Sequence, residues 1–174
     1  MMLKKMLTGV ACLSIAAVCA GEITWIANKG NAATAPTVTA VDVDGIGKIY
    51  RGEVVADGAY QSMSVKFSEP VDLQKYSGVE FYVSHNISKV RIGLVVRLEQ
   101  KPVNAYTTAV VETPDRTKVY VPFDAGKFNS TDGKTATFGK VHEICIYPYG
   151  EWNQKGEFFE FDNFRFVPKS EVAK

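Results

Sequence analysis

Acidic side chains near the end of this 174-residue chain are the first candidates for chemistry. They are Glu151, Glu157, Glu160 and Asp162. Two carboxylates on either side of a glycosidic bond can hydrolyse it, one as an acid and the other as a base or nucleophile. Solvated faces of strands routinely carry such residues, however, and no spacing here singles out one pair. We therefore expect a protein that is not an enzyme, with a glycoside hydrolase as the less favoured alternative.

The two histidines, His85 and His142, form no catalytic or metal-binding pattern with Cys145. His85 and His142 do not lie at metal-ligand spacing with each other or with Cys145. Cys145 lies in the apolar run 141–146, where a cysteine usually serves as a small buried hydrophobe. We expect Cys145 to have that role and not to act as a nucleophile.

Residues 42–53 place oxygen-bearing side chains at a spacing that partly matches a calcium-binding loop. Four of the five diagnostic positions match, but Ile46 stands where a ligand is required. The flanking residues have the composition of strands, whereas the calcium loop of this pattern lies between helices. We expect a strand, a turn at an Asp-Gly corner and a second strand; a cation held by Asp42 and Asp44 in another geometry is the alternative.

Aromatic side chains are the other chemical resource of the chain. Tyrosines alternate outward on several predicted strands, and a further group surrounds Tyr149. Sugars present flat C–H faces that stack on aromatic rings, and their hydroxyls need polar partners nearby. The candidate carbohydrate-binding residues are Tyr82, Arg91, Tyr106, Tyr120, Tyr147, Tyr149 and Trp152. The alternative is that these amphipathic rings cover the surface of the fold without a ligand.

Short runs rich in Val, Ile, Tyr, Phe and Thr, separated by turn residues, must position these side chains. In one run Val79, Phe81 and Val83 alternate with Glu80 and Tyr82, which sends the two sets to opposite faces. The predicted strands are 37–43, 48–56, 60–67, 78–84, 89–97, 104–111, 117–123, 141–147 and 157–166. The phase of the aromatic positions in 157–166 changes near Asp162, which predicts a bulge there. About nine strands without a helical period predict an all-β, two-sheet antiparallel β-sandwich of jelly-roll type.

The first twenty residues predict export. Lys4 and Lys5 precede an apolar run that ends at small residues, as in a cleaved secretory signal, and the run is too short to span a bilayer. We expect a secreted or periplasmic protein without a transmembrane segment in the mature chain. Lipidation of Cys19 is the minor alternative. The expected parts are a signal peptide at 1–20, a flexible leader at 21–36, the sandwich domain at 37–168 and a C-terminal tail at 169–174.

The formal charge of the chain argues against one class of partner. A net charge of +1 without a basic run does not supply the concentrated positive surface that binding to phosphates requires. We therefore expect no nucleic-acid partner.

Segments that follow one another along the chain carry a family resemblance. They are 72–83 (DLQKYSGVEFYV), 89–94 (KVRIGL), 117–123 (TKVYVPF), 141–146 (VHEICI) and 159–166 (FEFDNFRF). In order and spacing they resemble the jelly-roll carbohydrate-binding modules of the galactose-binding-like superfamily. The similarity is greatest to family 11-like modules and to the related domain of complex I intermediate-associated protein 30, and it covers about residues 45–167.

The resemblance implies two facing antiparallel sheets and a non-catalytic domain that binds a polysaccharide, either a β-glucan or a related plant glycan. It also implies a structural calcium near the terminal strands, where Asp162 matches the family's aspartate before the last hydrophobic residues. Asp42, Asp44 and Asp162 are thus the candidate metal ligands. Glycoside hydrolases and the cell envelope would supply the partners. A structural or protein-binding sandwich of the cell envelope is the alternative function, because a fold does not determine a function.

Overall fold

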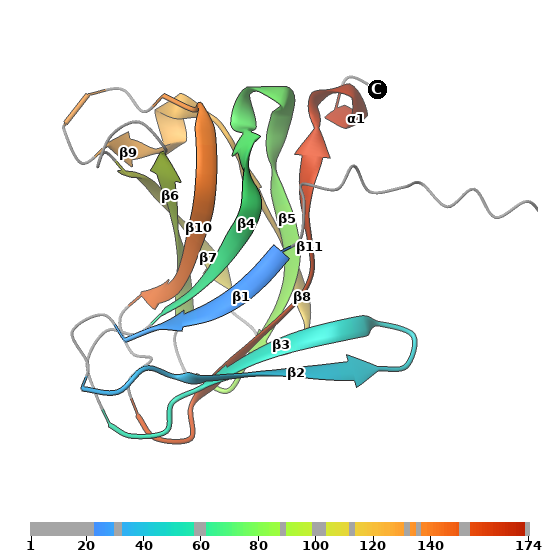
Figure 1. The fold of residues 1–174 in the computed structure, drawn as a ribbon, viewed down its shortest axis with the longest axis vertical. Coiled ribbons are helices and arrows are strands. Elements are labelled where there is room, and N and C mark those ends of the chain that lie inside the picture. The colour runs from blue at the N-terminus through green and yellow to red at the C-terminus, as the bar shows by residue number, and fades with distance from the viewer. Residues whose placement is uncertain are drawn as a thin grey trace, which may run out of the picture.

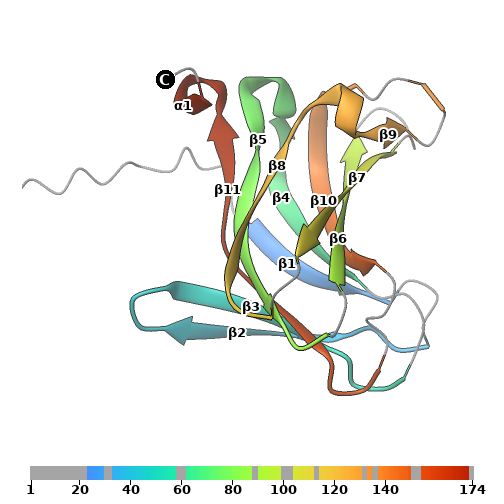
Figure 2. The ribbon, with the colours of Figure 1, turned by 180° about the vertical axis from the view of Figure 1, so that it is seen from behind.

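Two antiparallel sheets pack against each other in the computed structural model, which describes residues 23–29, 33–57, 62–87, 90–98, 104–111, 114–130, 133–134, 137–149 and 154–172. The six-stranded sheet has the order β1-β4-β10-β6-β7-β9 and the five-stranded sheet the order β2-β3-β11-β5-β8. Figures 1 and 2 show these sheets from opposite sides. The all-β, two-sheet antiparallel sandwich predicted from the sequence is confirmed.

The elements follow the predicted strands closely. Their bounds are β1 Ile23–Asn28, β2 Thr37–Val43, β3 Gly47–Glu53, β4 Ser62–Asp72, β5 Tyr76–His85, β6 Val90–Leu98, β7 Asn104–Val111, β8 Thr117–Pro122, β9 Asn129–Ser130, β10 Lys140–Tyr149, β11 Phe158–Pro168 and α1 Lys169–Val172. Two short 3₁₀ turns, Leu73–Lys75 and Ala125–Lys127, precede β5 and β9.

The core lies between the sheets and is rich in aromatic rings. The alternation in β5 is observed, because Val79, Phe81 and Val83 are fully buried while Glu80 and Tyr82 lie on the outer side. Phe81 packs edge-on against Phe161 of β11 at 5.8 Å between ring centroids. The alternating side chains of the two inner faces therefore fill this core, as expected for stacked sheets.

β1 corrects the expectation that residues 21–36 form a flexible leader. Ile23–Asn28 pairs with β4 along its whole length, from Ile23 opposite Phe67 to Asn28 opposite Ser62. The Trp25 ring is buried and stacks on Phe161 at 5.2 Å. The segment looked flexible because small and polar residues surround only two apolar anchors, Trp25 and Ile26, but burial of the Trp25 indole holds the strand on the sheet.

The hairpin between β2 and β3 settles the nature of residues 42–53. Residues 44–46 form a turn in which the Ile46 amide donates to the Val43 carbonyl at 3.1 Å. Gly45 and Gly47 have φ values of 76° and 98°, a region that side chains with a Cβ rarely adopt. The predicted arrangement of strand, turn and strand is confirmed.

A bulge in β11 changes which residues face the core. The register with β5 shifts between Asp162 and Arg165, and Asn163 takes the left-handed conformation with φ 52°. The extra residue lets Phe161 and Phe164, three positions apart, both contact the core aromatics. The bulge predicted near Asp162 is confirmed.

Several predicted features lie outside the described residues. They are the signal peptide at 1–20, Glu151 and Trp152. Within the ranges that the structure describes, no helix is long and apolar enough to cross a membrane.

Candidate functional site

The seven predicted binding residues do not form one group. Tyr82 on β5 and Tyr120 on β8 lie on the outer side of the five-stranded sheet. Arg91, Tyr106, Tyr147 and Tyr149 belong to the six-stranded sheet, on β6, β7 and β10. Trp152 is outside the described residues. The two sets therefore belong to opposite faces of the sandwich.

The outer side of the six-stranded sheet, here called the six-stranded face, collects four of the predicted positions. Ile144 and Ile146 of β10 are buried in the core, so that Glu143, Cys145, Tyr147 and Tyr149 occupy outer positions. Tyr149 pairs with Arg91, Tyr147 with Gly93 and Cys145 with Val95. Val95 in turn pairs with Tyr106 of β7. The strand register thus places Arg91, Tyr106, Tyr147 and Tyr149 on one face.

A row of hydrogen-bonded side chains crosses this face from β1 to β10. The Asn28 amide nitrogen Nδ2 donates to Ser64 Oγ at 2.7 Å, and Ser64 Oγ donates to Glu143 Oε1 at 2.6 Å. Beside the row, Cys145 Sγ donates to Ser62 Oγ at 3.4 Å. Glu143 also lies directly opposite Lys66 on one side and Arg97 on the other in the strand register. The face therefore has an ordered polar centre.

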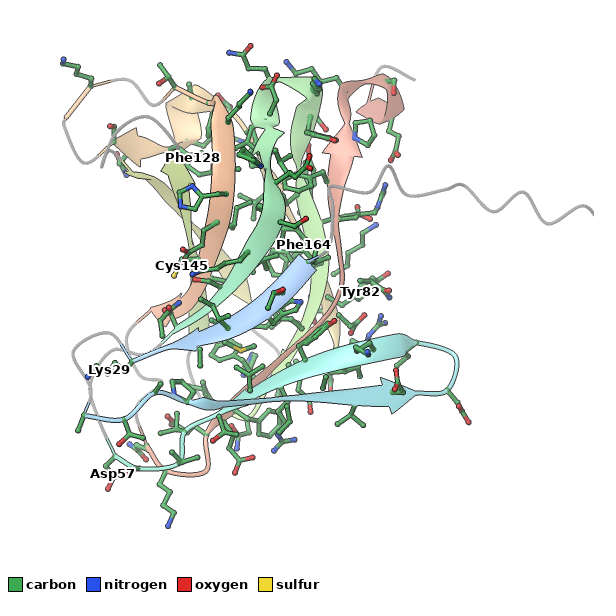
Figure 3. All side chains as sticks on the ribbon, viewed as in Figure 1. Lys29, Asp57, Tyr82, Phe128, Cys145 and Phe164 are labelled. Carbon is green, nitrogen blue, oxygen red and sulfur yellow. The ribbon has the colours of Figure 1, made fainter. Side chains whose placement is uncertain are left out.

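The centre of the six-stranded face is shielded although it lies outside the core. Ser64 is 0% and Glu143 7% exposed, and Ser62 and Cys145 are also buried. On the five-stranded sheet, by contrast, the outward Tyr120 is 43% exposed. Figure 3 shows Cys145 and Tyr82 on opposite sides of the molecule with Phe164 between them. Burial of a carboxylate or a hydroxyl costs free energy unless hydrogen bonds replace those lost to water. The hydrogen bonds of the row supply this compensation for Ser64 and Glu143.

On the outer side of the five-stranded sheet, here called the five-stranded face, the aromatic and acidic side chains contact other side chains of the same domain. Arg116 binds both oxygens of the buried Asp162 carboxylate: Nε donates to Oδ2 at 2.9 Å and Nη2 donates to Oδ1 at 2.6 Å. The hydrogen bond to Asp162 raises the pKa of Arg116. The same guanidinium lies 3.7 Å from the centroid of the Tyr82 ring. One face of the Tyr82 ring is therefore already occupied.

Tyr120 also has a structural contact. Its hydroxyl donates to the Ser77 carbonyl at 3.2 Å. Its ring extends over Gly78, where an added Cβ would lie only 2.8 Å from Tyr120 Cε2. The tyrosine thus covers a strand position that has no side chain of its own.

Ion pairs tie the strands of the five-stranded face together. Glu80 accepts from Arg165 Nε at 2.5 Å and from Lys118 Nζ at 2.9 Å. Burial acts to raise the pKa of Glu80, but the hydrogen bonds and charges of Arg165 and Lys118 outweigh burial and lower it. Arg165 continues the chain of charges to Glu171 at 3.0 Å.

Three of the four acidic residues considered for catalysis lie within the described part of the chain, and each of the three is engaged in hydrogen bonds or ion pairs. Glu160 accepts from Arg51 at 3.0 Å and from Ser84 at 2.9 Å. Glu157 accepts from the Gln154 amide at 2.9 Å, and Asp162 is held by Arg116. A catalytic acid needs an accessible proton within reach of a substrate, and these interactions serve the fold instead.

The three aspartates proposed as metal ligands are not brought together. Asp162 is in register with Ile49, and Ile49 is in register with Val41, so Asp42 lies on the opposite side of the sheet. Asp44 belongs to the hairpin turn. Among the described residues, no three His, Cys, Asp or Glu side chains form a group that could hold a metal. Both oxygens of Asp162 pair with Arg116, which does not fit a calcium ligand, and calcium binding by this domain stays a prediction.

Sequence reasoning missed the polar row of the six-stranded face. Ser62 and Ser64 alternate with Met63 and Val65, and Glu143 interrupts an apolar run one position before Ile144. Small polar residues in strict alternation with core residues are the signal that could have indicated this row. Asn28 could not be found in that way, because its strand was not predicted.

Comparisons with known proteins bear on the fold. No protein-family model matches the chain, and no curated protein is significantly similar to it in sequence. Among solved structures, a family 11 carbohydrate-binding module from Clostridium thermocellum, in complex with a β-1,3-1,4-mixed-linked tetrasaccharide, matches with a TM-score of 0.53 and 13% identity, over 84% of this chain and 88% of that one. A family 30 module of a cellulosomal cellulase from the same organism has a TM-score of 0.55 and 13% identity, over 83% and 90%.

A third structure is that of a variant of a family 29 module with cellulohexaose (cellohexaose). It has a TM-score of 0.50 and 10% identity, and the match covers 86% of this chain and 95% of that one. Nothing in these matches bears on the resemblance to the domain of complex I intermediate-associated protein 30, which stays a prediction. At such low identity the likeness concerns the fold, and the chain has the two-sheet β-sandwich fold of carbohydrate-binding modules.

Proposed function

We propose that this protein is a non-catalytic carbohydrate-binding domain and that the six-stranded face is its binding surface. The observation that carries the proposal is the row from Asn28 through Ser64 to Glu143, ordered and shielded on an outer face. These polar side chains lie outside the apolar core, so their hydrogen bonds add little to the stability of the fold. A ligand rich in hydroxyl groups needs such ordered polar groups as partners.

The aromatic positions of the same face supply the second requirement for a glycan. Tyr106, Tyr147 and Tyr149 share the face with Glu143 through the strand register. Tyrosine combines an apolar ring, on which the C–H face of a sugar can stack, with a hydroxyl that remains hydrogen-bonded. Arg91, directly opposite Tyr149, adds a donor for ring or hydroxyl oxygens.

The ligands of the structural neighbours suggest where to begin. The family 11 module is bound to a β-1,3-1,4-mixed-linked tetrasaccharide and the family 29 variant to cellohexaose. We propose a β-linked plant polysaccharide, with mixed-linkage β-glucan and cellohexaose as the first ligands to test. The absence of catalysis is supported by the ion pairs and hydrogen bonds that engage Glu157, Glu160 and Asp162.

Affinity electrophoresis of the purified protein in gels with soluble β-glucan, xylan or mannan tests the proposal. We expect retardation by at least one polysaccharide and no release of reducing sugar. Tyr149→Ala should weaken binding by about tenfold, equivalent to about 1.4 kcal/mol, while Tyr120→Phe on the five-stranded face should leave it unchanged. If none of the polysaccharides retards the protein, the proposal fails and the structural or protein-binding sandwich becomes the better account.

The N-terminal residues support a proposal about location. We propose that the protein is exported and that residues 1–20 are removed, on the basis of their charge and apolar run. N-terminal sequencing of the protein recovered from outside the cytoplasm should then begin at Gly21. Intact Met1 in the exported protein would contradict cleavage.

A further inference from the structure

β1 contributes Asn28 to the polar row of the six-stranded face, and hydrogen-bond chemistry determines the orientation of its amide. A carboxylate has no proton to donate, so Ser64 must give its only hydroxyl proton to Glu143 at 2.6 Å. Ser64 can then only accept from Asn28, and it does so at 2.7 Å. The Asn28 amide nitrogen therefore points to Ser64, and its Oδ1 points elsewhere.

Burial decreases along this row toward Asn28. Ser64 and Glu143 are buried, whereas Asn28 is partly exposed, so the buried pair anchors the amide of a residue at the edge of the shielded region. Asn28 lies opposite Ser62. In the register of β4 and β10, Tyr147 comes one residue after the pair of Ile146 with Met63, and therefore level with Ser62. Asn28 is thus in the same cross-strand row as a predicted stacking position, about 10 Å away at two strand spacings.

An amide held in one orientation can form hydrogen bonds with two neighbouring hydroxyls at once. Its second N–H is a donor and its Oδ1 an acceptor, side by side in one plane, and two adjacent hydroxyls of a sugar offer the complementary acceptor and donor. A single fixed orientation favours one arrangement of these hydroxyls over its epimer, because the wrong epimer leaves polar groups without partners.

We propose that Asn28 is a specificity-determining residue that binds two adjacent hydroxyls of a bound sugar, with Ser64 and Glu143 as positioning residues. This inference rests on the proposed function of the six-stranded face. It implies that β1 takes part in ligand binding and that the Asn28 amide binds a pair of adjacent sugar hydroxyls.

Calorimetric titration with cellohexaose and mannohexaose tests the inference, because the two chains differ in the configuration of one hydroxyl in each unit. We expect the wild-type Kd values to differ by about tenfold or more. Asn28→Ala should weaken binding of the preferred hexaose by about tenfold and bring the ratio of the two Kd values below about two. Ser64→Ala should reduce the same ratio although Ser64 is 0% exposed.

Thr24→Ala is the matched control, since Thr24 is an exposed residue on the same strand and the same side as Asn28. It should change neither Kd, and thermal unfolding should show that all variants remain folded. If wild type discriminates between the hexaoses and Asn28→Ala discriminates equally well, the inference is wrong while the proposed function stands. Equal Kd values in the wild type also overturn the inference alone. If neither hexaose binds, the inference fails, and the affinity electrophoresis with β-glucan, xylan and mannan decides separately whether the proposed function stands.

Discussion

Replacement of Arg116 by glutamine should destabilise the domain far more than an ordinary surface substitution. Asp162 is 4% exposed, and both of its oxygens depend on the Arg116 guanidinium. Removal of one partner from a buried pair costs about 3–5 kcal/mol, because the remaining charge stays desolvated. The Arg116 side chain is 35% exposed, so water offsets part of this cost. Loss of the contact with the Tyr82 ring removes about 0.5–1 kcal/mol more.

These contributions predict a loss of about 2–4 kcal/mol in the free energy of unfolding of Arg116→Gln. For a domain of this size the loss corresponds to a decrease in Tm of about 4–16 °C. Urea unfolding followed by tryptophan fluorescence measures the free energy, and calorimetry measures Tm. Lys118→Gln is the matched control: its side chain is 49% exposed, and Glu80 keeps Arg165 as a partner. We expect the control to lose less than about 1 kcal/mol.

Two results would refute this reasoning. In the first, Arg116→Gln is no less stable than Lys118→Gln. In the second, calcium raises the Tm of the wild type, a chelator lowers it, and Asp162→Asn abolishes the response. A double variant that carries both Arg116→Gln and Asp162→Asn should recover part of the stability, because it leaves no unpaired buried charge.

Three further substitutions test other parts of the fold. Gly78→Ala should cost more than about 2 kcal/mol in urea unfolding, because its Cβ would clash with the Val121 carbonyl and would lie 2.9 Å from Pro122 Cα; an unchanged midpoint would contradict the close packing of β5 and β8. Glu80 has a lowered pKa in the folded state, so its contribution to stability is present above about pH 4.5 and is lost as the pH falls through the lowered value. Glu80→Gln should therefore flatten the acid side of a plot of unfolding free energy against pH, and an unaltered slope would argue against the pairing. Trp25→Ala should cost about 3–5 kcal/mol if β1 belongs to the core, whereas a flexible leader would tolerate it.

Alternation predicted which residues leave the core but could not say to which outer face they go. Tyr82 and Tyr147 both alternate with apolar neighbours, yet they lie on opposite sheets. The distinction depends on the strand order, which comes from pairings between segments far apart in the chain. The engagement of Tyr82 could not be predicted for the same reason, because Arg116 reaches its ring from the segment before β8.

The strands themselves were predictable wherever several apolar residues alternated. The run from Val79 to Val83 shows this pattern clearly, and β5 was predicted within two residues at its start and one at its end. β1 has only Trp25 as a buried anchor, and the two-residue β9 is too short for a periodic signal. Asn28 was missed with β1, so the residue that we propose to determine specificity lies on a strand that the sequence pattern did not predict.

The position of β1 at the end of its sheet determines where this domain can be shortened. A protein that starts at Thr37, the boundary suggested by the sequence, would lose every partner that β1 provides to residues 62–67 of β4. The backbone donors and acceptors on that side of β4 would then be free to pair with other chains, next to a core that has lost the Trp25 ring. Such a fragment should aggregate during expression, and its insolubility would say nothing about the ligand that the intact protein binds.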